Sequence, residues 1–188
     1  MRTASAAAAL VLAAAPVLLA WNARFVDGPP PGFTGDFGEP TCGSCHMDAP
    51  VVADAPNLAL RDVPEQFEPA RAYLITVALH HPEMGAGGFE LSARTPAGTQ
   101  AGRWRSLDTR VRIVSDSTTG VAYAVHTAEG AALVGPDSAR WTLEWTAPES
   151  SGDTVVFSAA ANAADGDDSN FGDRIFTRRV TSAQRATP

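Results

Sequence analysis

The sequence predicts an all-β protein, an immunoglobulin-like antiparallel β-sandwich, on three observations. Short runs rich in Val, Ile, Thr, Phe, Tyr and Trp recur from about residue 57 onward, and several of them alternate apolar and polar side chains with a period of two. Turn residues, not helical stretches, separate the runs, which is typical of a sandwich. The clearest expected strands span residues 72–79, 88–94, 111–114, 121–126, 141–145, 155–159 and 174–180.

The run at residues 141–145 shows how the alternation assigns faces. Trp141, Leu143 and Trp145 lie at every second position, whereas Thr142 and Glu144 lie between them. Since successive side chains of a strand point to opposite faces, the three large apolar residues are expected in the core. Thr142 and Glu144 are expected to face solvent.

Four regions are expected along the chain. Residues 1–20 form an export signal, because Met1 and Arg2 give a short positive segment and an apolar stretch follows at residues 6–20. Residues 21–56 are rich in Gly and Pro and form an extended linker with a loop, residues 57–182 form the sandwich, and residues 183–188 form a polar tail. The mature protein is therefore expected outside the cytoplasm, periplasmic or at the cell surface, with membrane attachment only if the signal is not cleaved.

Composition narrows the classes of partner. The chain has 188 residues with 45% hydrophobic content, which is enough for one core of ordinary size. Its formal net charge is −7, and no run of basic residues occurs. Nucleic acid is therefore not an expected partner.

The only two cysteines occur in one motif, Cys42-Gly43-Ser44-Cys45-His46. The C-x-x-C-H spacing is typical of covalent c-type haem attachment, with Cys42 and Cys45 as thioether anchors and His46 as the proximal ligand of the haem iron. Glycines and prolines on both sides place the motif on a loop. Three alternatives remain open: a structural Cys42–Cys45 disulfide, a thioredoxin-like redox pair, and a zinc site.

A haem held by His46 would need a second axial ligand. His126 is the preferred residue, because it ends an alternating strand, and His81 and then Met84 follow as alternative distal ligands. Each histidine could equally hydrogen-bond backbone at a strand end. The aromatic residues Phe25, Phe33 and Phe37 either pin the linker to the sandwich or cover a porphyrin edge.

An acidic loop near the C-terminus is a candidate calcium site. Carboxylate oxygens clustered on a turn can ligate Ca²⁺, although this spacing is not that of an EF-hand and such turns are commonly just solvated connections. The candidate ligands are Asp165, Asp167, Asp168 and Asp173.

The landmarks from residue 35 to residue 180 resemble those of the bacterial choice-of-anchor V domain, a distant relative of the reelin-type (Reeler) sandwich. They include Gly38-Glu39-Pro40-Thr41-Cys42 leading into Cys45-His46, His81-Pro82, His126-Thr127, and the segments at residues 67–73, 88–91, 141–148 and 161–167. The resemblance implies the sandwich fold and an extracytoplasmic location. It implies no defined biochemical role.

Two functions follow as expectations. The first is an exported, single-haem, cytochrome c-like protein that transfers one electron at a time to an extracytoplasmic redox protein, or senses redox state. The second is a non-catalytic binding or adhesion module for a surface ligand, with Cys42–Cys45 as a structural disulfide. No catalytic triad, phosphate-binding glycine loop or paired catalytic carboxylates are recognisable, so enzymatic turnover is not expected.

Overall fold

The computed structural model describes residues 25–149 and 154–186. The export signal predicted for residues 1–20 lies outside these described residues. Within them, no helix is long and apolar enough to span a membrane.

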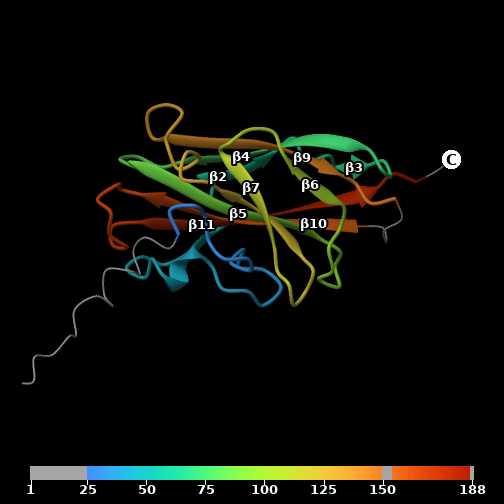
Figure 1. Cartoon of the computed structure of the whole chain (residues 1–188), viewed down its shortest axis with the longest axis horizontal. Helices are drawn as coiled ribbons and strands as arrows, with labels where there is room; N and C mark the ends of the chain where they lie inside the picture. The colour runs from blue at the N-terminus through green and yellow to red at the C-terminus, as the bar shows by residue number, and fades with distance from the viewer. Residues whose placement is uncertain (1–24, 150–153, 187–188) are drawn as a thin grey trace, which may run out of the picture.

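Two β-sheets pack face to face, as the sequence predicts (Figure 1). The larger sheet has the spatial order β1-β11-β10-β5-β8-β7, and β3 also pairs with β11. Its strands are β1 (Val52–Ala53), β3 (Gln66–Phe67), β5 (Ala86–Arg94), β7 (Val111–Ser115), β8 (Ala122–His126), β10 (Thr154–Ala164) and β11 (Arg174–Gln184). The smaller sheet has the order β2-β4-β9-β6. Its strands are β2 (Leu58–Arg61), β4 (Ala72–His80), β6 (Arg103–Ser106) and β9 (Ser138–Thr146).

The core lies between the two sheets and is rich in aromatic residues. Trp141, Leu143 and Trp145 of β9 are all buried in it, which confirms the face assigned from the alternation. Trp145 packs edge-on against Phe157 of β10 at a centroid distance of 4.8 Å, and its Nε1 donates to the carbonyl of Ala101 at 3.0 Å. The polar edge of the indole is thereby satisfied inside the core.

Two strands extend further than the sequence pattern indicates. β10 and β11 each have eleven residues and pair with one another antiparallel along almost their whole length. The C-terminal half of β10 is rich in alanine, which has a low β propensity, so composition alone does not mark it as a strand. Pairing with β5 on one side and β11 on the other sets its conformation.

A long segment before the first strands, residues 25–51, is called the arm below. It contains one regular element, the 3-10 turn η1 (Cys42–Ser44). Figure 1 shows the arm, in blue and cyan, along the outer face of the larger sheet, on the side away from β4 and β9. The sequence predicted a linker here, and in the structure this linker is a layer docked on the sandwich.

Candidate functional site

The outer face of the larger sheet is unusually polar for a buried surface. Glu90, Ser92 and Arg94 of β5 point away from the core, as do Ser158 and Asn162 of β10, and all five are buried. Buried charged side chains require partners, because desolvating a charge without compensation is costly. The arm supplies several of these partners.

Glu90 holds the start of the arm through its backbone. Its two carboxylate oxygens accept from the amides of Gly32 at 2.8 Å and Phe33 at 3.0 Å. The pKa of Glu90 is raised to about 8, because the rise caused by burial, and by the charge of Glu39, outweighs the lowering by the bonds from Gly32 and Phe33. Glu90 of β5 thus accepts hydrogen bonds from two backbone amides, as the carbonyl groups of a neighbouring strand would.

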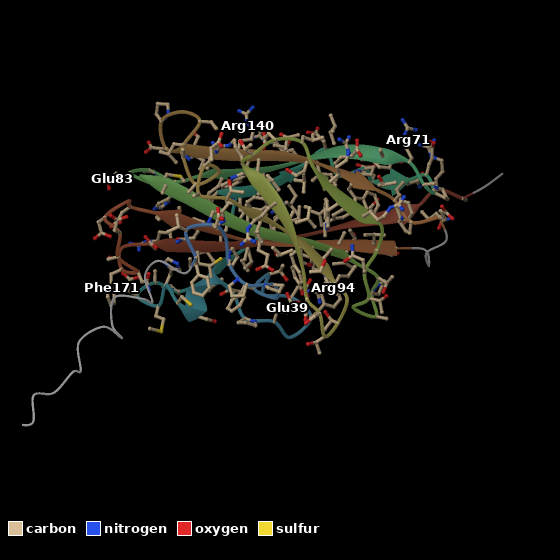
Figure 2. All side chains as sticks on the ribbon, in the orientation of Figure 1. Glu39, Arg71, Glu83, Arg94, Arg140 and Phe171 are labelled. Carbon is tan, nitrogen blue, oxygen red and sulfur yellow. The ribbon has the colours of Figure 1, made fainter. Side chains whose placement is uncertain are left out.

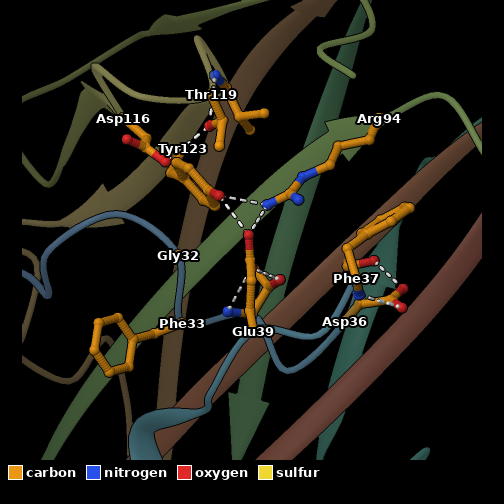
Figure 3. Close-up of polar contacts among 12 residues, drawn as sticks. Gly32, Phe33, Asp36, Phe37, Glu39, Arg94, Asp116, Thr119 and Tyr123 are labelled. Carbon is orange, nitrogen blue, oxygen red and sulfur yellow. Dashed lines mark hydrogen bonds and ion pairs between the residues drawn. The ribbon is translucent and has the colours of Figure 1, made fainter. Parts of the chain in front are cut away.

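Glu39 forms the second attachment, with Arg94 and Tyr123 (Figure 3). The guanidinium of Arg94 forms an ion pair with Glu39 and also bonds the phenol oxygen of Tyr123, and Tyr123 donates to Glu39 Oε1 at 2.5 Å. The other oxygen of Glu39 accepts from the hydroxyl of Thr34 at 2.5 Å. Burial and the bond to Glu39 raise the pKa of Tyr123 above its ordinary value.

The neighbouring residues Asp36 and Phe37 extend this attachment. Asp36 accepts from the hydroxyl of Ser158 at 2.6 Å and from Arg179 at 2.9 Å. The ring of Phe37 lies 4.8 Å from the guanidinium carbon of Arg94. Phe37 therefore pins the arm to the sandwich, one of the two roles predicted for it.

The C-x-x-C-H turn is the third attachment. The hydroxyl of Thr41 caps η1 by accepting from the amide of Gly43 at 3.1 Å, and the amides of Cys45 and His46 both donate to the carbonyl of Cys42. This turn directs the imidazole of His46 onto the sheet, where its Nδ1 contacts the buried carboxylate of Asp173.

Asn162 completes the contact between turn and sheet. Its Nδ2 donates to Asp173 Oδ2 at 3.0 Å and lies 3.2 Å from His46 Nδ1. The other oxygen of Asp173 accepts from the amide of Asp165 at 3.2 Å. His46 is therefore the centre of a structural network that joins the arm, β10 and the loop before β11.

The two cysteines differ in environment. Both are free thiols in this structure. Burial, and next the charge of Glu90, raise the pKa of the Cys42 thiol to about 12, so this thiol remains protonated at neutral pH. Cys45 is exposed at the surface of the turn.

The prediction of a haem-iron electron carrier is corrected by this arrangement. In residues 25–149 and 154–186, no group of three or more His, Cys, Asp or Glu side chains is placed so that it could hold a metal ion. The metal-binding and electron-transfer interpretation is therefore wrong for this site.

The three expected distal ligands each have a structural role. The Nδ1 of His126 accepts from the amide of Phe89 at 3.1 Å, and burial lowers the pKa of this histidine. The ring of His81 packs against Phe176 at a centroid distance of 5.7 Å. Met84 is buried in the core between the sheets.

The carboxylates of the acidic loop, the candidate calcium ligands, bond largely within the loop and to the arm. Asp173 is buried against His46, and Asp165 and Asp167 accept from the amides of Asp167 and Ser169, at 3.1 and 2.8 Å. Asp168 is exposed with a positive φ of 64°. These carboxylates thus stabilise the turn itself, and calcium binding stays a prediction from the sequence.

Exposed apolar side chains follow the C-x-x-C-H turn and lie in the acidic loop that contacts the arm, and we call this set the turn patch. It comprises Met47, Val51, Val52 and Phe171, of which Met47 is 71% and Phe171 66% exposed. The arm and the acidic loop meet here because Asp48 accepts from the amide of Gly172 at 2.6 Å. Figure 2 shows Phe171 at the end of the molecule where the arm carries its sulfur-containing side chains.

Sequence reasoning did not identify the residues that hold the arm. Glu90 and Arg94 occupy outward positions of the run at residues 88–94, so the alternation marks them as surface residues. The only signal for a covered face was the spacing of charged residues among Ser and Gly in a strand. That signal does not say which segment covers the strand.

Comparison with known proteins gives the fold. The chain is similar to the Reelin-N domain of F-spondin, with 17% identity over 77% of this chain and 97% of that one and a TM-score of 0.52. It is also similar to a human F-spondin reeler domain (18% identity, 73% and 95% coverage, TM-score 0.49) and to a cohesin module of a Clostridium perfringens family 33 glycoside hydrolase (12%, 69% and 94%, 0.42).

The sandwich is Reeler-like. Neither a family model nor a curated protein sequence matches the chain. The first of these likenesses confirms the Reeler-type fold predicted from the sequence landmarks.

The Arg94 attachment predicts a large loss of stability when its cation is removed. Arg94→Met leaves the carboxylate of Glu39 without its ion-pair partner under the arm, and we expect the free energy of unfolding in urea to fall by about 3–5 kcal/mol. Arg105→Met is the matched control, because Arg105 pairs with Glu144 at the exposed surface. The control should change stability little, and an equal effect of the two substitutions would contradict the attachment.

Proposed function

We propose that this protein is a non-catalytic, exported binding module that recognises a protein partner through the turn patch. The observation that carries the proposal is the exposure of Met47 and Phe171 beside a turn that is itself fastened to the sheet. Apolar side chains of this size that gather at one surface and are rimmed by polar residues are typical of protein interaction sites.

The electrostatic surroundings of the turn patch indicate the chemistry of the partner. Exposed carboxylates lie next to the apolar residues in the arm, after β1 and in the acidic loop. They are Asp48, Asp54, Asp165, Asp167 and Asp168. The partner is therefore a surface with apolar side chains framed by lysine or arginine, because complementary charge guides association and disfavours wrong partners.

The attachments of the arm favour binding by a preformed surface. Glu90, the Glu39–Arg94 pair and the His46–Asp173 pair each fix a different part of the arm before any partner arrives. Rigid presentation lowers the entropy lost on association. The C-x-x-C-H turn acts in this account as a scaffold for the turn patch.

The proposal also includes the family of the chain and the oxidation state of its two cysteines. The C-x-x-C-H landmarks support membership of the choice-of-anchor V group, whose resemblance implies an extracytoplasmic location. There, an oxidising compartment would allow Cys42 and Cys45, three residues apart on one short turn, to close a disulfide across η1. The bridge would stiffen the turn that positions Met47.

The binding surface can be tested with a defined basic partner. A synthetic amphipathic peptide of alternating leucine and lysine blocks should bind the protein, and Met47→Ser with Phe171→Ser should weaken binding about tenfold in titration calorimetry. Leu74→Ser is the control, because Leu74 is 55% exposed on β4, away from the turn patch. Equal weakening by Leu74→Ser, or no effect of the pair, would contradict the proposal.

The state of the cysteines can be tested by intact mass. Protein exported to the periplasm and purified without reductant should weigh two hydrogens less than the sequence of the processed chain, and should regain them on reduction. A gain of roughly 600 Da, the mass of a covalent haem, would overturn this assignment. An unchanged mass with two alkylatable thiols would contradict the Cys42–Cys45 disulfide.

A further inference from the structure

The outer face of the smaller sheet contains a hollow that is separate from the arm and the turn patch. It lies over β2, β4 and β9, opposite the arm, and has a volume of ≈ 260 Å³. Arg61, His80, Arg140 and Val134 are among the residues that line it, with Ala59 and Ala78 also in its lining. Figure 2 shows Arg140 projecting from the outer side of this sheet.

Strand register explains why the surface is hollow here. Ala78 of β4 pairs with Ala59 of β2 on one side and with Arg140 of β9 on the other. Along the same face of β4, its neighbours are Thr76 and His80. Two alanines side by side form a low floor, and the longer side chains around them form the walls.

The arginines at this hollow lack partners within the chain. In the part of the chain that the structure describes, Arg61, Arg103 and Arg140 are the arginines that make no hydrogen bond or ion pair through their side chains. Two of these three line the hollow. Two unpaired guanidinium groups are thus gathered at one place in a protein whose net charge is −7.

The same face of β9 also has a carboxylate that is paired with an arginine. Glu144, four residues after Arg140 on this strand, is bonded through both carboxylate oxygens by Arg105, at 2.9 and 2.6 Å. No Asp or Glu is among the residues that line the hollow, although the chain has 21 acidic residues against 14 basic ones. The paired arginine lies at one end of the sheet face, and the unpaired ones surround the alanine floor.

We propose that this hollow binds a carboxylate side chain presented by an acidic peptide segment of a partner protein. A guanidinium fork matches a carboxylate with two parallel hydrogen bonds, and His80 adds a further polar group beside Arg140. The aliphatic lining of Ala59, Ala78 and Val134 accepts the methylene groups of a glutamate. The lining contains no Phe, Tyr or Trp ring on which a sugar could stack.

The size and position of the hollow fit this ligand. A volume of ≈ 260 Å³ accommodates one or two residue side chains and is smaller than the usual pocket for a drug-sized molecule. The hollow lies on the opposite face of the sandwich from the arm, so this site goes beyond the proposed function and does not depend on it. Loss of binding at one site leaves the other intact.

The test uses an oligoglutamate peptide and the whole mature protein. Calorimetry at low salt should detect binding, and Arg61→Gln with Arg140→Gln should weaken it about tenfold. Arg103→Gln is the control, because Arg103 is likewise an exposed arginine without a partner but lies on β6, outside the lining of this hollow. Arg103→Gln should leave the affinity unchanged.

Other anions separate the proposal from its alternatives. Inorganic sulfate and an oligouronate, measured at the same ionic strength, should bind at least about tenfold more weakly than oligoglutamate, because neither places a carboxylate on a flexible methylene arm over the alanine floor. Tighter binding of the oligouronate would overturn the assignment to a peptide. If Arg103→Gln weakened binding as much as the paired substitutions, the binding would depend only on overall positive charge. That result would also overturn the proposal.

Discussion

The arrangement of the molecule depends on the burial of carboxylates between the arm and the larger sheet. Glu90 and Asp173 project from the sandwich, Glu39 from the arm, and each is satisfied by a group of the other layer. Because an unsatisfied buried charge or amide is costly, the arm and the outer face of the sheet stabilise one another. Glu90 is 0% exposed, and this burial raises the pKa of its carboxyl group.

This constraint explains how a glycine- and proline-rich segment becomes a defined layer. The arm pairs with no strand of the sheet before β1, so side chains of β5, β8 and β10 hold it. The C-x-x-C-H turn is placed by the same means, through His46 and Asp173. Attachment at several separate points leaves the turn patch exposed and fixed in place, which is what a binding surface requires.

The fold was predictable from the sequence because alternation records which face of a strand is buried. Trp141, Leu143 and Trp145 were assigned to the core from this pattern, and all three are buried there. The alanine-rich end of β10 has no such alternation of apolar and polar residues. Alanine suits this position through its small size between two neighbouring strands and not through its β propensity.

The candidate site was predictable only in part. Cysteine spacing drew attention to the correct turn, but it gave no sign of the contact between His46 and Asp173. Asp173 is 127 residues further along the chain, and a contact over such a distance leaves no periodic pattern in the sequence. Glu90 and Arg94 were likewise visible only as polar positions of a strand, since alternation identifies an outward face without saying what covers it.

Hydrogen exchange at the amides of Gly32 and Phe33 tests the central claim most directly. If Glu90 holds the arm, these two amides should exchange slowly in the unaltered protein, and Glu90→Gln should speed their exchange at least about tenfold while amides of β4 and β9 are unaffected. Glu144→Gln, which removes a surface carboxylate, should leave them protected. Exchange of Gly32 and Phe33 in the unaltered protein as fast as in exposed loops would contradict the account.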